Sequence, residues 1–175
     1  MKKLYLSLLL SLFAVNSYTM IIDNLDDKRA NWSAFSDDVM GGISEVNFYE
    51  LVEGEDKFYR LEGNVSTAND GGFIQSRVSV NIKTDKYKGI RIKVRGNNNK
   101  YFIHLRGPRM LPWNYYYSSF FASKEWTIID LPLSDFKYNR KPDTGLDTKR
   151  IRSIGIVAYG KDFQAELDLA QIELY

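Results

Sequence analysis

Two short stretches of the sequence place aspartate beside paired glycines. They read SDDVMGG over residues 36–42 and NDGGF over residues 69–73. Aspartate side chains accept hydrogen bonds from backbone N–H groups in tight turns, and glycine there supplies positive φ or lets two backbones approach closely. Carboxylate and carbonyl oxygens are also the ligands that Ca²⁺ prefers. The stretches therefore predict either a structural corner or a site for a ligand or Ca²⁺ where both turns meet.

The structural corner is the simpler interpretation, because Asp, Asn and Gly are the ordinary residues of turns. Its predicted members are Trp32, Asp37, Asp38, Gly41, Gly42, Gly71 and Gly72. A glycosidase with paired carboxylates fits poorly, since adjacent residues of an extended segment, such as Asp37 and Asp38, point to opposite faces. We assign no metal and no cofactor to the chain.

Few residues in this sequence could serve as catalytic groups. His104 is the only histidine, there is no cysteine, and no nucleophile-elbow motif accompanies the histidine. Thiolate nucleophiles and thiolate metal sites are excluded, and a His-based zinc site is unsupported. We therefore predict a protein that is not an enzyme.

A basic sheet face is the first candidate binding surface. His104 and Arg106 alternate along one run, and Arg91, Lys93 and Arg95 alternate along the run before it. The GNNN stretch between the two runs is typical of a hairpin turn, which would join both sets on one face. Such a face is either solvated or a patch for an anionic partner or glycan.

An aromatic stretch, RGPRMLPWNYYYSSFF (106–121), is the second candidate surface. Sugar-binding and protein-binding surfaces both use exposed aromatic faces beside polar groups or arginine, and the alternative is a loop folded back on the core. Taken together, the predicted binding residues are Arg95, His104, Arg106, Arg109, Trp113, Tyr115, Tyr116 and Tyr117.

The elements that must position these residues are strands. Apolar and polar residues alternate, as antiparallel sheets with one face on a core require, in RVSVNIK, GIRIKVRG and KYFIHLRG. Near the C-terminus the apolar phase flips between Leu169 and Ile172, which predicts a bulge near Ala170 and Gln171. We expect eight to ten strands in an all-β jelly-roll sandwich.

The N-terminus has the features of a secretory signal peptide. Lys2 and Lys3 precede an apolar run over 4–15 that is too short to span a bilayer. The predicted segment, 1–17, holds two of the 24 Lys and Arg and none of the 22 Asp and Glu, so the mature chain has 22 of each. That balance does not indicate nucleic-acid binding. We expect a single domain over 18–175, periplasmic or secreted.

The order and spacing of seven stretches carry a further signal. The sequence reads, in order, WSAFSDDVMGGIS, RLEGNVS, NDGGFIQSR, YKGIRIKVRGNNNKYFIHLR, WTIIDLPLSDF, IRSIGIVAYG and FQAELDLAQIEL. Together they resemble the complex I intermediate-associated protein 30 family over nearly the whole mature chain. The resemblance implies a galactose-binding-like jelly-roll fold and a non-catalytic role. Mitochondrial members of that family assist the assembly of NADH:ubiquinone oxidoreductase.

Two functions follow from the resemblance and the candidate surfaces. The first is an exported module that binds a protein partner, as an assembly factor does. The alternative is a carbohydrate-binding module of the galactose-binding-like type. Association with a membrane is expected only through a partner.

Export is directly testable. The mature protein should begin near Tyr18, because Lys2, Lys3 and the leucine-rich run that follows direct export and cleavage. N-terminal sequencing of the periplasmic or secreted protein checks this, and protein recovered from the cytosol with Met1 intact would contradict it.

Overall fold

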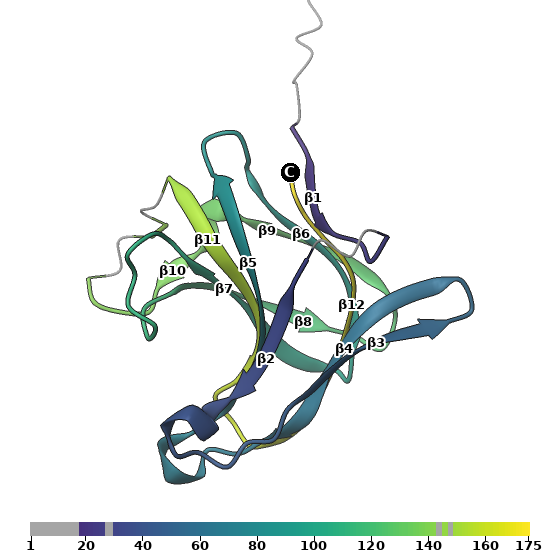
Figure 1. The fold of residues 1–175 in the computed structure, drawn as a ribbon, viewed down its shortest axis with the longest axis vertical. Coiled ribbons are helices and arrows are strands. Elements are labelled where there is room, and N and C mark those ends of the chain that lie inside the picture. The colour runs from purple at the N-terminus through teal and green to yellow at the C-terminus, as the bar shows by residue number, and fades with distance from the viewer. Residues whose placement is uncertain (1–17, 27–29, 143–144, 147–148) are drawn as a thin grey trace, which may run out of the picture.

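The protein is an all-β sandwich, as the alternating sequence predicted (Figure 1). The computed structural model describes residues 18–26, 30–142, 145–146 and 149–175, and the predicted signal peptide lies outside them. Sheet A has the order β3 (Asn47–Glu53), β4 (Asp56–Val65), β12 (Phe163–Leu174), β6 (Gly89–Gly96) and β9 (Thr127–Pro132), with β1 (Met20–Asp23) also paired to β12. Sheet B has the order β10 (Lys137–Tyr138), β8 (Tyr116–Ala122), β7 (Asn99–Arg106), β11 (Arg150–Tyr159), β5 (Phe73–Lys83) and β2 (Trp32–Ser36).

Connections between strands include three short 3₁₀ helices. They are η1 (Asp37–Met40), η2 (Ala68–Asp70) and η3 (Leu133–Asp135). Within the described ranges, no helix has the length and hydropathy that a membrane crossing requires. Twelve strands form in those ranges, more than the eight to ten expected, because short edge strands such as β1 and β10 add to the count.

The core lies between the two sheets and is filled by the alternating apolar residues. Ile90 and Ile92 of β6 face it from sheet A, and Tyr101, Ile103 and Leu105 of β7 face it from sheet B, all with no exposed surface. The opposite set of side chains on each strand therefore points to the outside of the sandwich.

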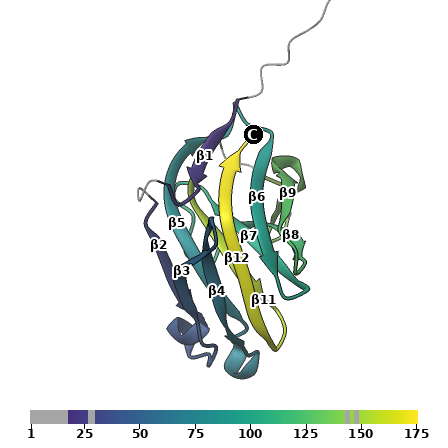
Figure 2. The ribbon, with the colours of Figure 1, turned by 90° about the vertical axis from the view of Figure 1, so that its right-hand side faces the viewer.

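The predicted bulge in the last strand is confirmed. β12 runs through the middle of sheet A (Figure 2), and its register against β6 shifts between Leu169 and Gln171. Because a bulge inserts one extra residue, the apolar residues on both sides of it reach the same core. Leu167 and Leu169 are 1% and 2% exposed before the shift, and Ile172 is fully buried after it.

The predicted hairpin at GNNN is wrong. β6 pairs with β12 and β9 in sheet A, whereas β7 pairs with β11 and β8 in sheet B, so the turn crosses between the sheets. Its backbone bonds to the end of β8, with Gly96 donating to Ser123 and Asn98 to Ala122. Asn98 has a φ of 60°. Residues that tolerate positive φ suit both a hairpin within one sheet and a turn that crosses between two sheets. Only the pairing of strands distant in sequence decides between these two connections.

The two aspartate–glycine stretches meet at one buried carboxylate, that of Asp37. Its oxygens accept hydrogen bonds from the Ser44 N–H (2.9 Å) and hydroxyl (2.6 Å), and from the N–H groups of Gly72 (2.5 Å) and Phe73 (3.1 Å). Burial by itself raises the pKa of Asp37, but these four donors outweigh it and hold the pKa below the ordinary 3.8. The carboxylate is therefore ionised at neutral pH and occupied by protein donors.

Paired glycines are needed because the chain wraps closely around this carboxylate. A Cβ atom would lie 2.2 Å from Asp37 Oδ1 at Gly42 and 2.5 Å from Oδ2 at Gly71. Gly41 and Gly72 have φ angles of 90° and 123°, which side chains disfavour. Two other residues were predicted as members of the corner. Asp38 follows Asp37 and is exposed, and Trp32 donates its indole N–H to Asp23. Among the residues described, no group of three or more His, Cys, Asp or Glu could hold a metal ion.

We predict that Gly42→Ala and Gly71→Ala each lower the free energy of unfolding by about 3 kcal/mol, because overpacking a rigid site displaces the carboxylate from its donors. The control is Gly54→Ala, where φ is 62° but nothing lies within 4 Å of the added atom. That change should cost only about 1 kcal/mol. Urea unfolding of the three variants measures the difference, and equal losses in all three would show that the carboxylate is not the constraint.

Candidate functional site

The outer face of sheet B is hollowed into a groove, called here the sheet B groove. Two adjoining hollows of about 600 and 540 Å³ form it, and they share His104, Tyr115, Asn139 and Tyr159. A groove lined by aromatic side chains and a few convergent polar groups is the usual form of a small-ligand or glycan site.

The floor of the groove follows from strand register. One row of directly opposed residues runs from Phe35 on β2 through Gln75 and Val157 to Phe102 on β7. Opposed residues in antiparallel strands share a face, and this face is the one turned away from the core. The row therefore forms a continuous floor across four strands.

A second row lies two residues further along the strands, on the same face, and runs from β5 through β11 and β7 to β8. Arg77, Gly155, His104 and Tyr117 oppose one another in turn. Gly155 has no side chain, and an added Cβ there would lie 2.0 Å from Gln75 Nε2, so the Gln75 amide lies across this glycine. Gln75 Nε2 is buried without a hydrogen-bond partner among the described residues.

The walls of the groove come from two segments that are distant in sequence. Val39 and Met40 of η1 form one wall, and Pro112 and Trp113 of the loop between β7 and β8 form the other. Val39 is 68% exposed and Trp113 is 55% exposed. The SDDVMGG stretch and the aromatic stretch thus line one groove, although the sequence showed no relation between them.

The loop of Trp113 is anchored through its backbone. Arg106 donates from Nε and Nη2 to the Pro112 carbonyl at 3.2 and 3.1 Å. Asn139 donates to the Trp113 carbonyl at 2.9 Å and accepts from the Tyr115 N–H at 3.0 Å. The Trp113 side chain is consequently held at the rim without being needed to hold the loop.

His104 is a flat, neutral part of the floor. It is 5% exposed, and its ring stacks on Tyr115 with centroids 3.9 Å apart at 13°. Burial, and then the charge of Arg106, lower the pKa of His104 to about 3. Within the described chain no serine or carboxylate hydrogen-bonds to this ring, so the geometry for nucleophilic catalysis is not assembled there.

Five of the predicted binding residues line the groove: His104, Arg106, Trp113, Tyr115 and Tyr117. Three do not. Tyr116 starts strand β8, is 7% exposed and faces the core, because alternate residues of a strand point to opposite faces. Arg109 is exposed beyond the lining residues, and Arg95 lies on sheet A, so the single basic face joining Arg95 to His104 does not exist.

Sequence reasoning missed several lining residues, including Phe35, Phe73, Gln75, Arg77, Phe102 and Tyr159. A signal for them was present. Phe73, Phe102 and Tyr159 are large aromatic residues at positions out of phase with the apolar set of their own strands. Large aromatic residues on the solvent-facing side of a strand indicate a binding surface.

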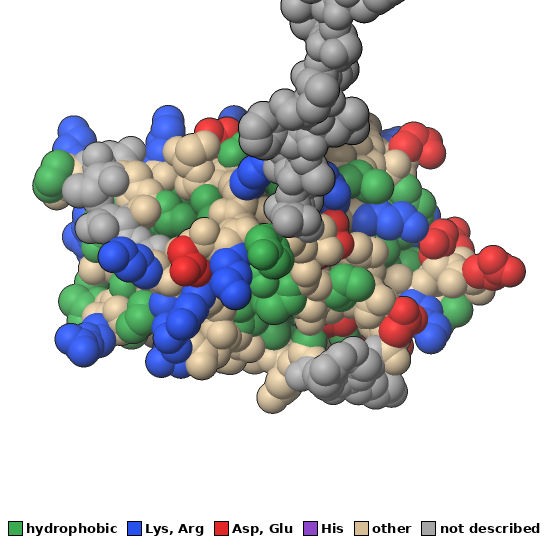
Figure 3. Space-filling view, turned by 90° about the horizontal axis from the view of Figure 1, so that it is seen from above, with side chains coloured by type: hydrophobic (Ala, Val, Ile, Leu, Met, Phe, Trp, Pro, Cys, Tyr) green, Lys and Arg blue, Asp and Glu red, His purple; other side chains and the backbone are tan. Residues whose placement is uncertain are grey.

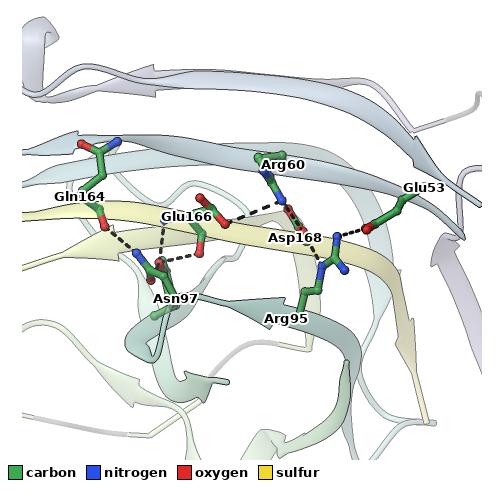
Figure 4. Close-up of polar contacts among 8 residues, drawn as sticks. Glu53, Arg60, Arg95, Asn97, Gln164, Glu166 and Asp168 are labelled. Carbon is green, nitrogen blue, oxygen red and sulfur yellow. Dashed lines mark hydrogen bonds and ion pairs between the residues drawn. The ribbon is translucent and has the colours of Figure 1, made fainter. Parts of the chain in front are cut away.

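The outer face of sheet A is different, because its charges neutralise one another (Figure 4). Arg60 forms two hydrogen bonds with Asp168, at 2.7 and 2.8 Å. Arg95 donates to Asp168 at 2.7 Å and also to Glu53. Glu166 lies 3.8 Å from Arg60. Asp168 is 2% exposed, so its carboxylate is enclosed by the two arginines with which it pairs.

Comparisons with known proteins bear on both family and fold. A family model described as complex I intermediate-associated protein 30 matches residues 23–169. Among solved structures, the family 11 carbohydrate-binding module of a cellulosomal cellulase of Clostridium thermocellum is similar, with a TM-score of 0.74 and 17% identity over 90% of this chain and 94% of that one. Its complex with a β-1,3-1,4-mixed-linked tetrasaccharide gives a TM-score of 0.71 and 17% identity, over 89% and 94%.

A family 30 carbohydrate-binding module is also similar, with a TM-score of 0.57 and 11% identity over 76% of this chain and 80% of that one. At these identities the likeness establishes the fold alone, a galactose-binding-like jelly-roll β-sandwich. No curated protein matches the sequence.

The exposure of Trp113 leads to a prediction about stability. Trp113→Ala should change the free energy of unfolding by less than about 1 kcal/mol, because an exposed side chain contributes little to the core. Phe136→Ala, at a residue that is 1% exposed in the core, should cost about 3–5 kcal/mol. Thermal or urea unfolding compares them, and a comparable loss in Trp113→Ala would place that side chain in the core.

Proposed function

The chain belongs to the complex I intermediate-associated protein 30 family, and from that premise we propose that it is a non-catalytic module that binds a polysaccharide in the sheet B groove. The observation that carries the proposal is the lining of the groove, in which aromatic faces lie beside buried hydrogen-bond donors that have no partner in the described part of the chain. Sugars present apolar ring faces and a rim of hydroxyl groups, so a site for them needs both features.

The aromatic faces are distributed along the groove. Phe102 and Tyr159 lie edge to face with centroids 6.0 Å apart, Tyr115 and Tyr117 are 6.3 Å apart, and Trp113 stands at the rim. A polymer with several sugar units can contact several of these rings at once. An open groove, rather than a closed pocket, suits such a chain.

The free donors supply the polar half of the site. Nη1 of Arg106 and Nε2 of Gln75 are buried and lack hydrogen-bond partners among the described residues. Leaving a buried donor unpaired costs about 1–3 kcal/mol, so a ligand oxygen that reaches one after a small side-chain movement is favoured. The export expected from residues 1–17 would bring the protein to the polysaccharides of the cell envelope and the surroundings.

A protein partner is the second candidate, and one observation favours it. Val39, Met40 and Trp113 form apolar rims that are 68%, 65% and 55% exposed, and exposed apolar side chains around a groove are typical of protein interfaces. The family description points in the same direction. The unpartnered donors on the floor favour the glycan, which reverses the order expected from the sequence.

Binding to polysaccharides in affinity gels or by titration calorimetry tests the proposal. Tyr159→Ala should weaken binding about tenfold or more, because Tyr159 is 45% exposed over the groove and anchor residues carry much of the binding energy. Tyr49→Ala is the matched control, since Tyr49 is 37% exposed on sheet A, and it should leave affinity unchanged. Failure of the wild type to bind any polysaccharide in a broad panel, or equal effects of both variants, would refute the proposal.

A further inference from the structure

Two arginines of the sheet B groove have no carboxylate partner among the residues that the structure describes. Arg77 comes from β5 and Arg106 from β7, with β11 between these strands. In the part of the chain that the structure describes, no Asp or Glu forms an ion pair with either guanidinium. On β11, Gly155 is opposite Arg77 and Ser153 is opposite Arg106, so the floor between the two arginines carries only small side chains of its own.

Both guanidinium groups are oriented by their surroundings. The Cζ atom of Arg77 lies 4.9 Å from the centre of the Phe35 ring, and that of Arg106 lies 5.7 Å from the centre of Tyr115. Arg106 is further fixed by its two hydrogen bonds to the Pro112 carbonyl, and its Nη1 has no partner within the described ranges. Groups that are already held in place lose little conformational entropy when a ligand binds.

The two positive charges also repel each other. Burial lowers the pKa of Arg106, and the charge of Arg77 lowers it further, to about 10. Arg106 is therefore a cation at neutral pH, in an environment that disfavours its charge. An anionic group bound beside both arginines would relieve the burial penalty and the repulsion together.

Arginines on sheet A show that this lack of pairing is particular to the groove. Arg60 and Arg95 share Asp168, and Arg91 pairs with Asp130 at 2.6 Å. The groove is lined by two more cations, Arg140 and Lys141, and by a single acid, Asp70, among the described residues. Seen from above, Lys and Arg predominate on the side of sheet B, at the left, and Asp and Glu gather toward the β3–β4 hairpin, at the right (Figure 3).

We propose that the sheet B groove selects an acidic polysaccharide, with a carboxylate or sulfate group of the polymer held between Arg77 and Arg106. The inference depends on the proposed polysaccharide-binding function and adds the charge of the ligand to it. Guanidinium groups bind planar carboxylates and sulfates through paired, charge-assisted hydrogen bonds. The aromatic rings then contact the sugar rings on either side of the bound anion.

Two pairs of polymers, each with one sugar backbone in a charged and a neutral form, separate the effect of ligand charge from that of the sugar backbone. Polygalacturonate and its methyl ester test for a carboxylate, and dextran sulfate and dextran test for a sulfate. The purified protein should bind the charged member of at least one pair ten times more tightly than the neutral member at moderate salt. Because salt screens the attraction between arginine and a carboxylate or sulfate, the preference should fall as the salt concentration rises.

Substitutions assign the preference to the two arginines. Arg77→Met and Arg106→Met should each remove most of the discrimination between charged and neutral polymer, whereas Lys57→Met, which removes one charge from β4 of sheet A, should alter affinity less than twofold. Thermal melts check folding, and Arg77→Met serves if Arg106→Met loosens the loop at Pro112. Arg77→Lys should restore part of the preference.

The outcomes distinguish the selection of an anionic ligand from the proposed polysaccharide binding itself. Equal affinity for the charged and neutral polymers, with binding still lost in Tyr159→Ala, would overturn the anionic ligand while leaving polysaccharide binding in place. Charge-dependent binding that weakens equally in Lys57→Met would show only nonspecific attraction and would also overturn it. No binding to any polymer would remove the proposed function itself.

Discussion

The buried carboxylate of Asp37 is the constraint on which this end of the structure depends. It joins the end of β2, through η1, to the start of β5, and its Ser44 partner in turn accepts a hydrogen bond from Ser66 at 2.9 Å beside β4. An ionised group with no accessible surface is tolerated only when its oxygens are fully bonded, so the surrounding backbone has little freedom to move. The paired glycines are a consequence, because they alone allow the chain to approach so closely.

That constraint reaches the groove directly. η1 begins at Asp37 and presents Val39 and Met40 as a wall, and β5 begins at Phe73 on the groove floor. The same hydrogen bonds that close the corner therefore set the position of one side of the candidate site. A site built on strands and on a bonded corner holds its side chains more firmly than one built on loops alone.

The arginines of the two sheets have different partners, and this difference distinguishes the outer face of sheet A from the groove of sheet B. On sheet A, Asp168 lies between Arg60 and Arg95 and forms an ion pair with each. On sheet B, Arg77 and Arg106 are supported by aromatic rings and a carbonyl group instead of carboxylates. Similarity to carbohydrate-binding modules establishes only the fold at 17% identity, so any function has to be argued from these side chains.

The sequence by itself determined the all-β class and the bulge after Leu169, because alternation and turn residues are local properties of the chain. Its resemblance to the family came from the order and spacing of seven motif stretches, and the family model confirms it. It also singled out the corner residues and part of the groove, including His104 and Trp113. Only the tertiary structure decided that β6 and β7 belong to different sheets, that Tyr116 faces the core between two groove tyrosines, and that η1 and the Trp113 loop share one groove. The physical reason is that strand pairing and the phase of each strand depend on partners far away in the sequence. That Arg77 and Arg106 pair with no carboxylate among the described residues also depends on neighbours distant in sequence, so no local pattern could show it.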